Sequence, residues 1–204
     1  MKTSALFCFI LLLTSCSNSS EYGDSSNYLS TYVYDVNQAK IIPNNSDEVY
    51  YSLYMNGSQA KWGDLNKQKY NSFAKLFNDE SFNKPFIYMF TQPVLADTIT
   101  KIDFICKQAF DVNHSQNSNI NDLINISSCS VKEYLESGYT LNETFKVTRE
   151  PLTSFNRRKH ILMTSGFTFS FTQSPENLNS CDIICKVYRN NDLICEVSHI
   201  YQFN

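Results

Sequence analysis

The chain has 204 residues, with 17 lysines and arginines against 20 aspartates and glutamates, which gives a net charge of −3 at neutral pH. This balance argues against nucleic acid as a partner and against binding to a membrane through a polybasic surface, because both require clustered basic side chains. The length fits one domain with a tail. The 13 tyrosines and 15 phenylalanines, against only 5 glycines, favour pleated strands.

The chain begins with a pattern typical of an export signal. Lys2 is followed by an apolar run over residues 5–13. This run is too short for a membrane-spanning helix, which needs about 20 apolar residues, but it has the length of a secretory signal core, about 7–15 residues. The next residues, Leu13-Thr14-Ser15-Cys16, resemble the lipobox of bacterial lipoproteins. The resemblance implies that residues 1–15 are removed as a lipoprotein signal peptide and that lipid is attached to Cys16.

Lipid on Cys16 implies a place in the cell envelope. Two or more acyl chains make a stable membrane anchor, and in bacterial lipoproteins a residue other than Asp after the cysteine, here Ser17, is compatible with the outer membrane. A secreted eukaryotic protein with an ordinary signal peptide is the alternative. Six N-x-S/T sequons would suit it, beginning at Asn18, Asn44, Asn56, Asn113, Asn125 and Asn142. Such triplets arise by chance in a chain rich in Asn and Ser, so we favour a lipoprotein anchored in the outer membrane.

The composition along the chain predicts three parts. These are the signal peptide over residues 1–15, a polar tether over residues 16–45 and a single β-sandwich domain over residues 46–204. Within the tether, residues 28–36 alternate weakly between apolar and polar. They fit either a first strand or an extended continuation of the tether.

The first part of the domain predicts a strand and then a helix. Residues 49–55 predict a strand that ends at the Asn56-Gly57 turn signal. Residues 64–79 have apolar side chains at helical spacing and predict an amphipathic helix of about three turns, with Asp64 as its N-cap. The apolar positions of this helix are Leu65, Phe73, Leu76 and Phe77. Core packing explains this aromatic stripe better than a ligand site does.

The rest of the chain predicts strands with short insertions. Strands are expected over residues 86–91, 98–107, 144–149 and 161–173, and as a hairpin over residues 181–203. Side chains expected to share a core face are Ile102, Phe104 and Cys106 in one strand and Phe167, Phe169 and Phe171 in another. A capping box from Ser130 to Glu133 predicts a short helix closed by Gly138. Together these patterns predict a mainly β fold, an antiparallel, immunoglobulin-like β-sandwich with one or two short inserted helices.

The cysteines raise the question of a disulfide. Five of the seven remain after Cys8 leaves with the signal and Cys16 takes lipid, and an odd number leaves at least one free thiol. A three-residue hairpin loop at 189–191 would place Cys185 opposite Cys195 on a matched apolar face. We therefore predict that any disulfide among the last three cysteines joins Cys185 to Cys195 and omits Cys181. Two unbonded thiols packed side by side are the alternative.

Two stretches carry a family resemblance. "ITKIDFICKQAFDVNHSQNSNINDLI" and "FKVTREPLTSFNRRKHILMT" resemble uncharacterised lipoproteins of the Bacteroidetes, which share an I-x-x-I-x-I strand, an F-D-x-x-H stretch, an N-D-L turn and a T-x-E-P loop. The matching positions are Ile99, Ile102, Phe110, Asp111, His114, Asn121, Asp122, Leu123, Thr148, Glu150 and Pro151. Phe104 replaces the third isoleucine, and the Pro-Ala-Gly expected after His114 is missing. Because that family has no known function, the resemblance implies a fold and a location and no activity.

No catalytic or metal site is predicted, and no cofactor. His114, His160 and His199 lie outside any nucleophile motif, and His199 shares a strand face with apolar residues, where a core histidine is the usual explanation. The acidic residues look like solvated turn residues, and no pair of carboxylates suggests a glycosidase. Residues 111–119 alternate oxygen-bearing side chains but lack the glycine and glutamate of a calcium loop. The spacing of Cys181 and Cys185 is not that of a zinc ribbon.

The remaining interpretation is a binding, display or assembly protein on the surface or in the periplasm. Its expected partners are the membrane, through Cys16, and a glycan or protein ligand. The alternatives are an envelope enzyme acting on glycans and a structural accessory lipoprotein. Exposed aromatic side chains beside acids in a groove would favour glycan binding, whereas two carboxylates in a deep cleft would favour the enzyme.

Overall fold

The computed structural model describes residues 29–44, 50–65, 67–80, 92–138 and 145–203, and in this part of the chain the fold is mainly β, as predicted. One sheet has six strands in the order β3 (Val94–Leu95), β1 (Thr31–Pro43), β2 (Tyr50–Lys61), β7 (Gly166–Phe171), β5 (Ile124–Ser130) and β6 (Lys146–Pro151). The other has the order β4 (Lys101–Cys106), β8 (Ser180–Arg189) and β9 (Asp192–Gln202). Short helices are α1 (Gln68–Leu76), α2 (Lys132–Glu136) and α3 (Leu152–Phe155), with a 3₁₀ turn at Asn121–Leu123.

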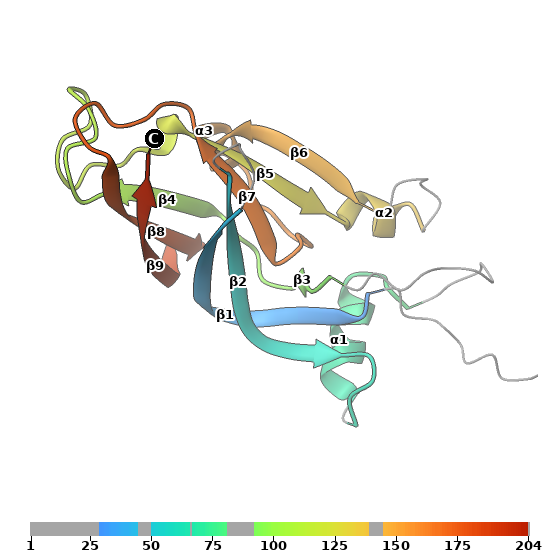
Figure 1. Ribbon diagram of the computed structural model, residues 1–204. Helices are drawn as coiled ribbons and strands as arrows, with labels where there is room; N and C mark the ends of the chain where they lie inside the picture. The colour runs from blue at the N-terminus through green and yellow to red at the C-terminus, as the bar shows by residue number, and fades with distance from the viewer. Residues whose placement is uncertain (1–28, 45–49, 66, 81–91, 139–144, 204) are drawn as a thin grey trace, which may run out of the picture.

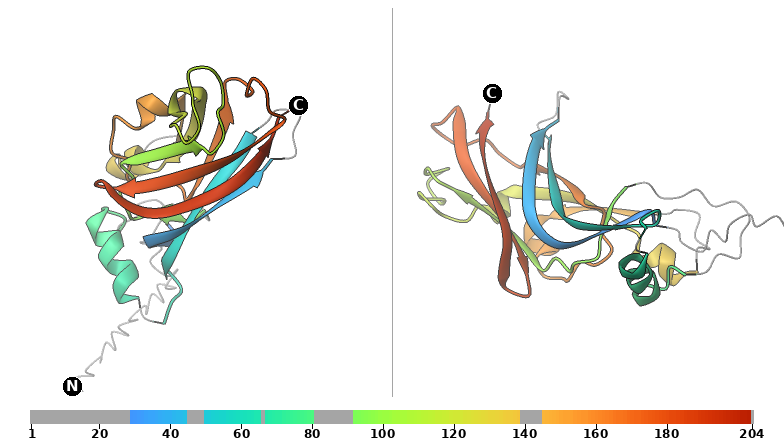
Figure 2. Two further views of the ribbon diagram at one scale, coloured as in Figure 1. Left: turned by 90° about the vertical axis from the view of Figure 1, so that its left-hand side faces the viewer. Right: turned by 90° about the horizontal axis from the view of Figure 1, so that it is seen from below.

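The two sheets form separate layers, with β8 and β9 lying beside β1 and β2 (Figures 1 and 2). The six-stranded sheet is curled into a half-barrel, so the predicted immunoglobulin-like sandwich is not confirmed. β2 connects the two parts of this sheet, because its Tyr50–Tyr54 end pairs with β7 while Tyr51–Lys61 pairs with β1. The predictions for residues 1–28 and the predicted strand at 86–91 lie outside the described residues.

The folded domain begins earlier than predicted. β1 lies inside the segment expected to be a tether, and it pairs with β2 from Thr31 opposite Lys61 to Pro43 opposite Tyr51. Tyr32 is fully buried, although its polar neighbours in the sequence suggest an exposed segment. The interpretation of this segment as a first strand is therefore confirmed for residues 31–36, and the tether prediction for residues 31–43 is wrong.

The turn predicted at Asn56-Gly57 is also wrong, because β2 continues through both residues. β1 bulges opposite them, and its pairing shifts between Tyr34 and Gln38. A Cβ atom on Gly57 would lie 2.5 Å from the carbonyl oxygen of Tyr34 and 2.8 Å from that of Asp35. The glycine thus permits a close approach of two backbones, which is a known role of glycine inside strands.

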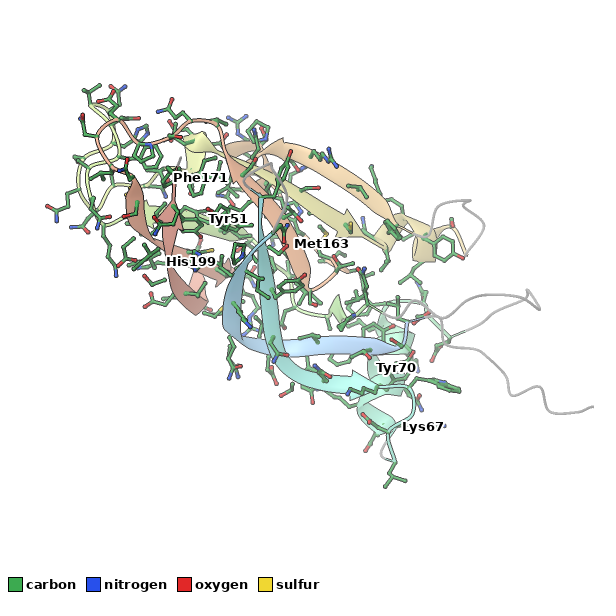
Figure 3. The ribbon with its side chains drawn as sticks, in the orientation of Figure 1. Tyr51, Lys67, Tyr70, Met163, Phe171 and His199 are labelled. Carbon is green, nitrogen blue, oxygen red and sulfur yellow. The ribbon has the colours of Figure 1, made fainter. Side chains whose placement is uncertain are left out.

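The main core fills the space between the sheets. Phe167 and Phe169 of β7 are each 1% exposed, and Ile102, Phe104 and Cys106 of β4 are fully buried, so both predicted strand faces are confirmed. Phe171 packs at the margin of this core. Figure 3 shows Tyr51, Phe171 and His199 gathered between the layers, with the Tyr51 ring 6.1 Å from that of Phe171 and 6.0 Å from that of His199.

A second cluster lies where α1 covers the far ends of β1 and β2. The helix is confirmed, but it begins at Gln68, and the Asp64 carboxylate accepts the N–H of Lys61 (2.9 Å) instead of capping it. The predicted apolar face is partly wrong, since Leu65 and Leu76 are exposed while Tyr70 and Ala74 are buried. The short helix predicted after residue 130 is α2, and Gly138 follows it with a φ of +64°. The Ser130 hydroxyl oxygen accepts the N–H of Lys132 (3.1 Å), the first residue of α2, in place of the Glu133 N–H that the predicted capping box uses.

The β8–β9 hairpin is confirmed, but its register differs from the prediction. Its turn has two residues, Asn190 and Asn191, with φ of +50° and +74°. A bulge interrupts the strand pairing near this turn, between Val187 and Tyr188. The pairing sets Cys185 opposite Val197 and Val187 opposite Cys195. The three-residue loop and the direct opposition of the two cysteines are therefore wrong, because the bulge restores the apolar face after a tight asparagine turn.

The described cysteines are all free thiols. Cys185 and Cys195 lie diagonally on one face of the hairpin and are both buried. Burial raises the pKa of the Cys195 thiol to about 11 and holds that of Cys185 well above its usual value. Both groups are consequently protonated and unreactive at neutral pH.

Candidate ligand-binding groove

The face of the six-stranded sheet that points away from the core carries polar side chains in cross-strand rows. Residues opposed across neighbouring strands share a face. The first row is Tyr50, Ser170 and Asn125, and the second is Ser52, Thr168, Ser127 and Arg149. Their neighbours along β7, Phe167 and Phe169, point into the core. One alternating pattern therefore produces both the core and this polar surface.

Two hollows lie along these rows and share Thr168. Their volumes are about 490 Å³ and 340 Å³, and small-molecule sites usually measure about 300–1,000 Å³. We call this surface the polar groove. Side chains on the outer face of the sheet that line it include Tyr50, Ser52, Tyr54, Asn125, Ser127, Cys129, Arg149, Thr168 and Ser170.

Tyr54 forms an aromatic platform in the groove. It lies on β2 opposite Gly166 of β7, and its side chain is 46% exposed. A Cβ atom on Gly166 would lie 2.9 Å from Cε1 and 3.2 Å from Cδ1 of the ring. The ring therefore rests on the bare backbone of the glycine, an arrangement that holds an aromatic side chain flat on a sheet.

Arg149 is the cation on the groove face of β6. Glu150 lies opposite the core residue Ile126, so its carboxylate is on the other face of the strand, where it forms an ion pair with Arg158. Arg149 is exposed and makes no ion pair with any residue that the structure describes. Hydrolysis of a glycoside usually requires two carboxylates on either side of the bond. The described side chains of the groove are thus suited to hydrogen bonding and stacking.

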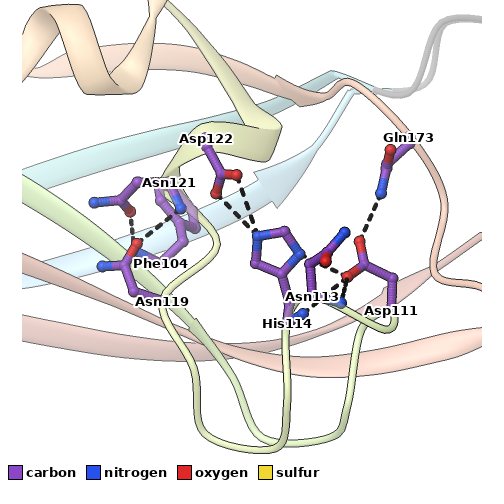
Figure 4. A network of polar contacts seen from close by, with 8 residues as sticks. All are labelled: Phe104, Asp111, Asn113, His114, Asn119, Asn121, Asp122 and Gln173. Carbon is purple, nitrogen blue, oxygen red and sulfur yellow. Dashed lines mark hydrogen bonds and ion pairs between the residues drawn. The ribbon is translucent and has the colours of Figure 1, made fainter.

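Two of the motifs that carry the family resemblance meet at His114, in the network shown in Figure 4. The Oδ1 atom of Asp111 accepts the backbone N–H groups of Asn113 (2.8 Å) and His114 (2.9 Å) and lies 2.7 Å from His114 Nδ1. His114 Nε2 lies 3.1 Å from the Asp122 carboxylate. Gln173 donates to the other Asp111 oxygen over 2.7 Å. The F-D-x-x-H stretch is thereby joined to the N-D-L turn.

The same network is attached to β4 through Asn121. Its Oδ1 accepts the N–H of Phe104 (2.8 Å), and its Nδ2 donates to Asp103 (2.8 Å). Both nitrogens of His114 already face carboxylates. This arrangement fixes the loop between β4 and β5, and it leaves neither histidine nitrogen free to act as a base.

The charges of the network shift two pKa values in opposite directions. Burial lowers the pKa of His114, but the hydrogen bonds and charges of Asp111 and Asp122 outweigh this effect and raise it above its usual 6.5. Burial likewise raises the pKa of Asp111, but the hydrogen bonds from His114 and from two backbone N–H groups bring it below its usual 3.8.

These shifts predict a pH window for the network. The contribution of His114 to stability is complete below about pH 6.5 and is lost as the pH rises through its raised, folded-state pKa. The contribution of Asp111 is complete above about pH 3.8 and is lost as the pH falls through its lowered pKa. Urea midpoints measured between pH 3 and 9 should therefore differ most between wild type and His114→Gln from about pH 4 to 6.5. Asp122→Asn should move the upper limit of this window to lower pH, and a difference that does not vary with pH would contradict the assignment.

The other two histidines serve in packing. His160 is buried, its Nε2 lies 2.8 Å from the carbonyl oxygen of Phe155, and burial lowers its pKa. His199 is half-buried, and its ring packs edge-on against those of Tyr51 and Tyr201. In the described part of the chain, no group of three His, Cys, Asp or Glu side chains is arranged to hold a metal ion.

Comparisons with known proteins identify no relative. No family model matches the chain, and no curated protein or solved structure matches it. The resemblance to Bacteroidetes lipoproteins therefore stays a prediction. Among the helices that the structure describes, none has the length and apolar character needed to cross a membrane.

Proposed function

We propose that this protein is a lipid-anchored binding protein of the bacterial cell envelope and that it binds an oligosaccharide in the polar groove. The observation that carries the proposal is the exposed ring of Tyr54, held flat on Gly166 beside rows of hydroxyl and amide side chains. A sugar ring presents C–H groups that pack on an aromatic face, and hydroxyl groups that both donate and accept hydrogen bonds. Ser, Thr and Asn side chains also do both.

The spacing of these groups suits a ligand of several units. Neighbouring strands lie about 4.8 Å apart, so side chains of one row follow each other at that interval. The second row runs from Ser52 through Thr168 and Ser127 to Arg149 and spans four strands. Because side chains on paired strands are held by the ladder, they need little ordering when a ligand binds. An extended, hydroxyl-rich chain would contact the Thr168, Ser127 and Arg149 part of this row, because Ser52 is buried and donates its hydroxyl to Asn44 (3.1 Å).

The ligand test begins with a glycan array, probed with the full chain in detergent. Tyr54→Ala should weaken binding of the best glycan at least tenfold, about 1.4 kcal/mol, because the platform is lost. Gly166→Ala should also weaken it, since the new methyl group displaces the ring. Trp62→Ala is the matched control, because Trp62 is a similarly exposed aromatic residue, 37% exposed, outside the groove. Equal losses for Tyr54→Ala and Trp62→Ala, or no bound glycan, would refute the groove as the site.

The lipid anchor is proposed from the lipobox at Leu13–Cys16 and from Ser17 after it, which support attachment in the outer membrane of a Bacteroidetes cell. Cys16→Ala should release the protein into the soluble fraction and abolish labelling with a palmitate analogue. Cys8→Ala is the control, because this cysteine lies in the segment that would be removed. Membrane retention and labelling of Cys16→Ala at the wild-type level would show that Cys16 is not the anchor.

A further inference from the structure

A third hollow, of about 330 Å³, lies apart from the polar groove, between the loop that follows α3 and the tip of the β8–β9 hairpin. It is lined by Thr100, Asn156, Arg157, Arg158, Lys159, Asn190 and Asn191. We call it the basic hollow. We propose that it binds an oxyanion, a phosphate or sulfate group carried by a larger molecule. This inference does not depend on glycan binding in the groove.

The loop of residues 157–159, which forms the basic wall of the hollow, is attached at both ends to the segment at the start of β4. Asn156 accepts the N–H of Ile102 through Oδ1 (2.8 Å) and donates to the carbonyl oxygen of Ile102 through Nδ2 (2.7 Å). At the other end, His160 and Ile99 exchange backbone hydrogen bonds of 2.8 and 2.9 Å. The three basic residues between these two attachments therefore sit on a short loop with little freedom.

The opposite wall is attached to the same segment. Thr100 donates its N–H to the carbonyl oxygen of Tyr188 (3.0 Å), and its Oγ1 accepts the N–H of Asn190 (3.0 Å). Residues 99–102 thus hold the basic loop on one side and the asparagine turn on the other. A site whose walls are already in place loses little entropy when a ligand binds.

The positive charge of the basic hollow is only partly neutralised by ion pairs among the described residues. Three consecutive cations line it, in a chain whose net charge is −3. Arg158 is neutralised by Glu150, but Arg157 and Lys159 are exposed and make no ion pair with any residue that the structure describes. No described residue lining the hollow is acidic. Like charges on one short loop repel each other, and an anion bound among them reduces that repulsion.

The donor set suits an oxyanion better than a neutral ligand. An arginine side chain presents a planar fork that matches two phosphate or sulfate oxygens, and lysine adds a point charge. The side chains of Asn190 and Asn191 can add neutral N–H donors. Two sources share this chemistry: a soluble phosphate or sulfate ester, and the headgroup of an anionic lipid near the proposed anchor.

The test uses the full chain in detergent and follows backbone amide signals by NMR. Inorganic phosphate, inorganic sulfate and glycerophosphoglycerol, the deacylated headgroup of phosphatidylglycerol, are titrated separately. Saturable shifts are expected at Lys159, Asn190 and Asn191. The double variant Arg157→Gln/Lys159→Gln should weaken the affinity at least tenfold. Lys40→Gln/Lys75→Gln is the control, because it removes the same charge from exposed positions outside the hollow.

Each outcome decides the proposal. Saturation by glycerophosphoglycerol identifies a lipid headgroup as the source, whereas saturation by inorganic phosphate or sulfate alone identifies a soluble ester. The proposal is overturned if none of the three saturates, which would leave only a diffuse charge effect. Equal weakening in the two double variants would overturn it as well. Neither result bears on glycan binding in the groove, whose test uses different residues.

Discussion

Replacing Phe169 by alanine is expected to lower the free energy of unfolding by about 3–5 kcal/mol, the usual loss for a buried Phe. Phe169 is 1% exposed, and its ring lies 4.7 Å from that of Phe104 and 5.6 Å from that of Tyr51, measured between centroids. The contacts come from both sheets, so the truncation opens a cavity where the layers meet. Urea unfolding followed by circular dichroism measures the loss.

Thr168→Ala is the matched control for Phe169→Ala. Thr168 is the adjacent residue of β7, and it points to the other face of the sheet, where a change usually alters stability by less than about 0.5 kcal/mol. Phe169→Leu keeps most of the volume and should cost much less than Phe169→Ala, which guards against a variant that fails to fold. Equal losses for the alanine variants at 168 and 169 would show that the strand or its facing is wrongly assigned.

The features that the sequence predicts correctly are those that a short segment determines by itself. Alternation along β7 and β4 identifies which apolar side chains enter the core, although Asp103 on the other face of β4 is also buried. Two asparagines between apolar runs predict the β8–β9 hairpin. Its register was not predictable in the same way, since the bulge between Val187 and Tyr188 shifts the pairing by one residue.

The features that the sequence does not predict depend on segments far apart in the chain. The polar groove combines β2, β7, β5 and β6, and Tyr54 is distinguished from neighbouring tyrosines only by Gly166, more than 100 residues later. The motif residues Asp111, His114 and Asp122 are visible in the sequence, but their contacts are not. The basic residues 157–159 are also visible, although the net charge of the whole chain conceals their local concentration.

Gly57 shows how a long-range contact overrides a local signal. Asn-Gly is a strong turn signal by itself, yet β2 continues through it because β1 supplies a partner strand with a bulge at this point. The bulge is held in place by Asp97, whose carboxylate accepts the N–H of Val36 (2.8 Å) and pairs with Arg189 (3.0 Å). The backbone that faces Gly57 therefore cannot withdraw without breaking these contacts.

Gly57→Ala is accordingly expected to destabilise the protein by about 1–3 kcal/mol, the usual range for forcing extra atoms into a packed site. Its Cβ would lie 2.5 Å and 2.8 Å from the carbonyl oxygens of Tyr34 and Asp35, which are backbone atoms that no side-chain rotation can move. In an open strand the same change is mildly favourable, because glycine costs more conformational entropy than alanine. The sign of the effect thus reports the close approach of the two strands.

Gly63→Ala supplies the matched comparison, since a Cβ at Gly63 would meet no atom within 4 Å. This variant should leave stability unchanged or raise it by about 0.4–1 kcal/mol through the unfolded state. The free energies of unfolding of the two variants, measured by urea denaturation, should change in opposite directions or differ by at least the loss expected for Gly57→Ala. If both variants match wild type, β1 does not bulge against Gly57, and the Asn56-Gly57 pair forms the turn that its sequence suggests.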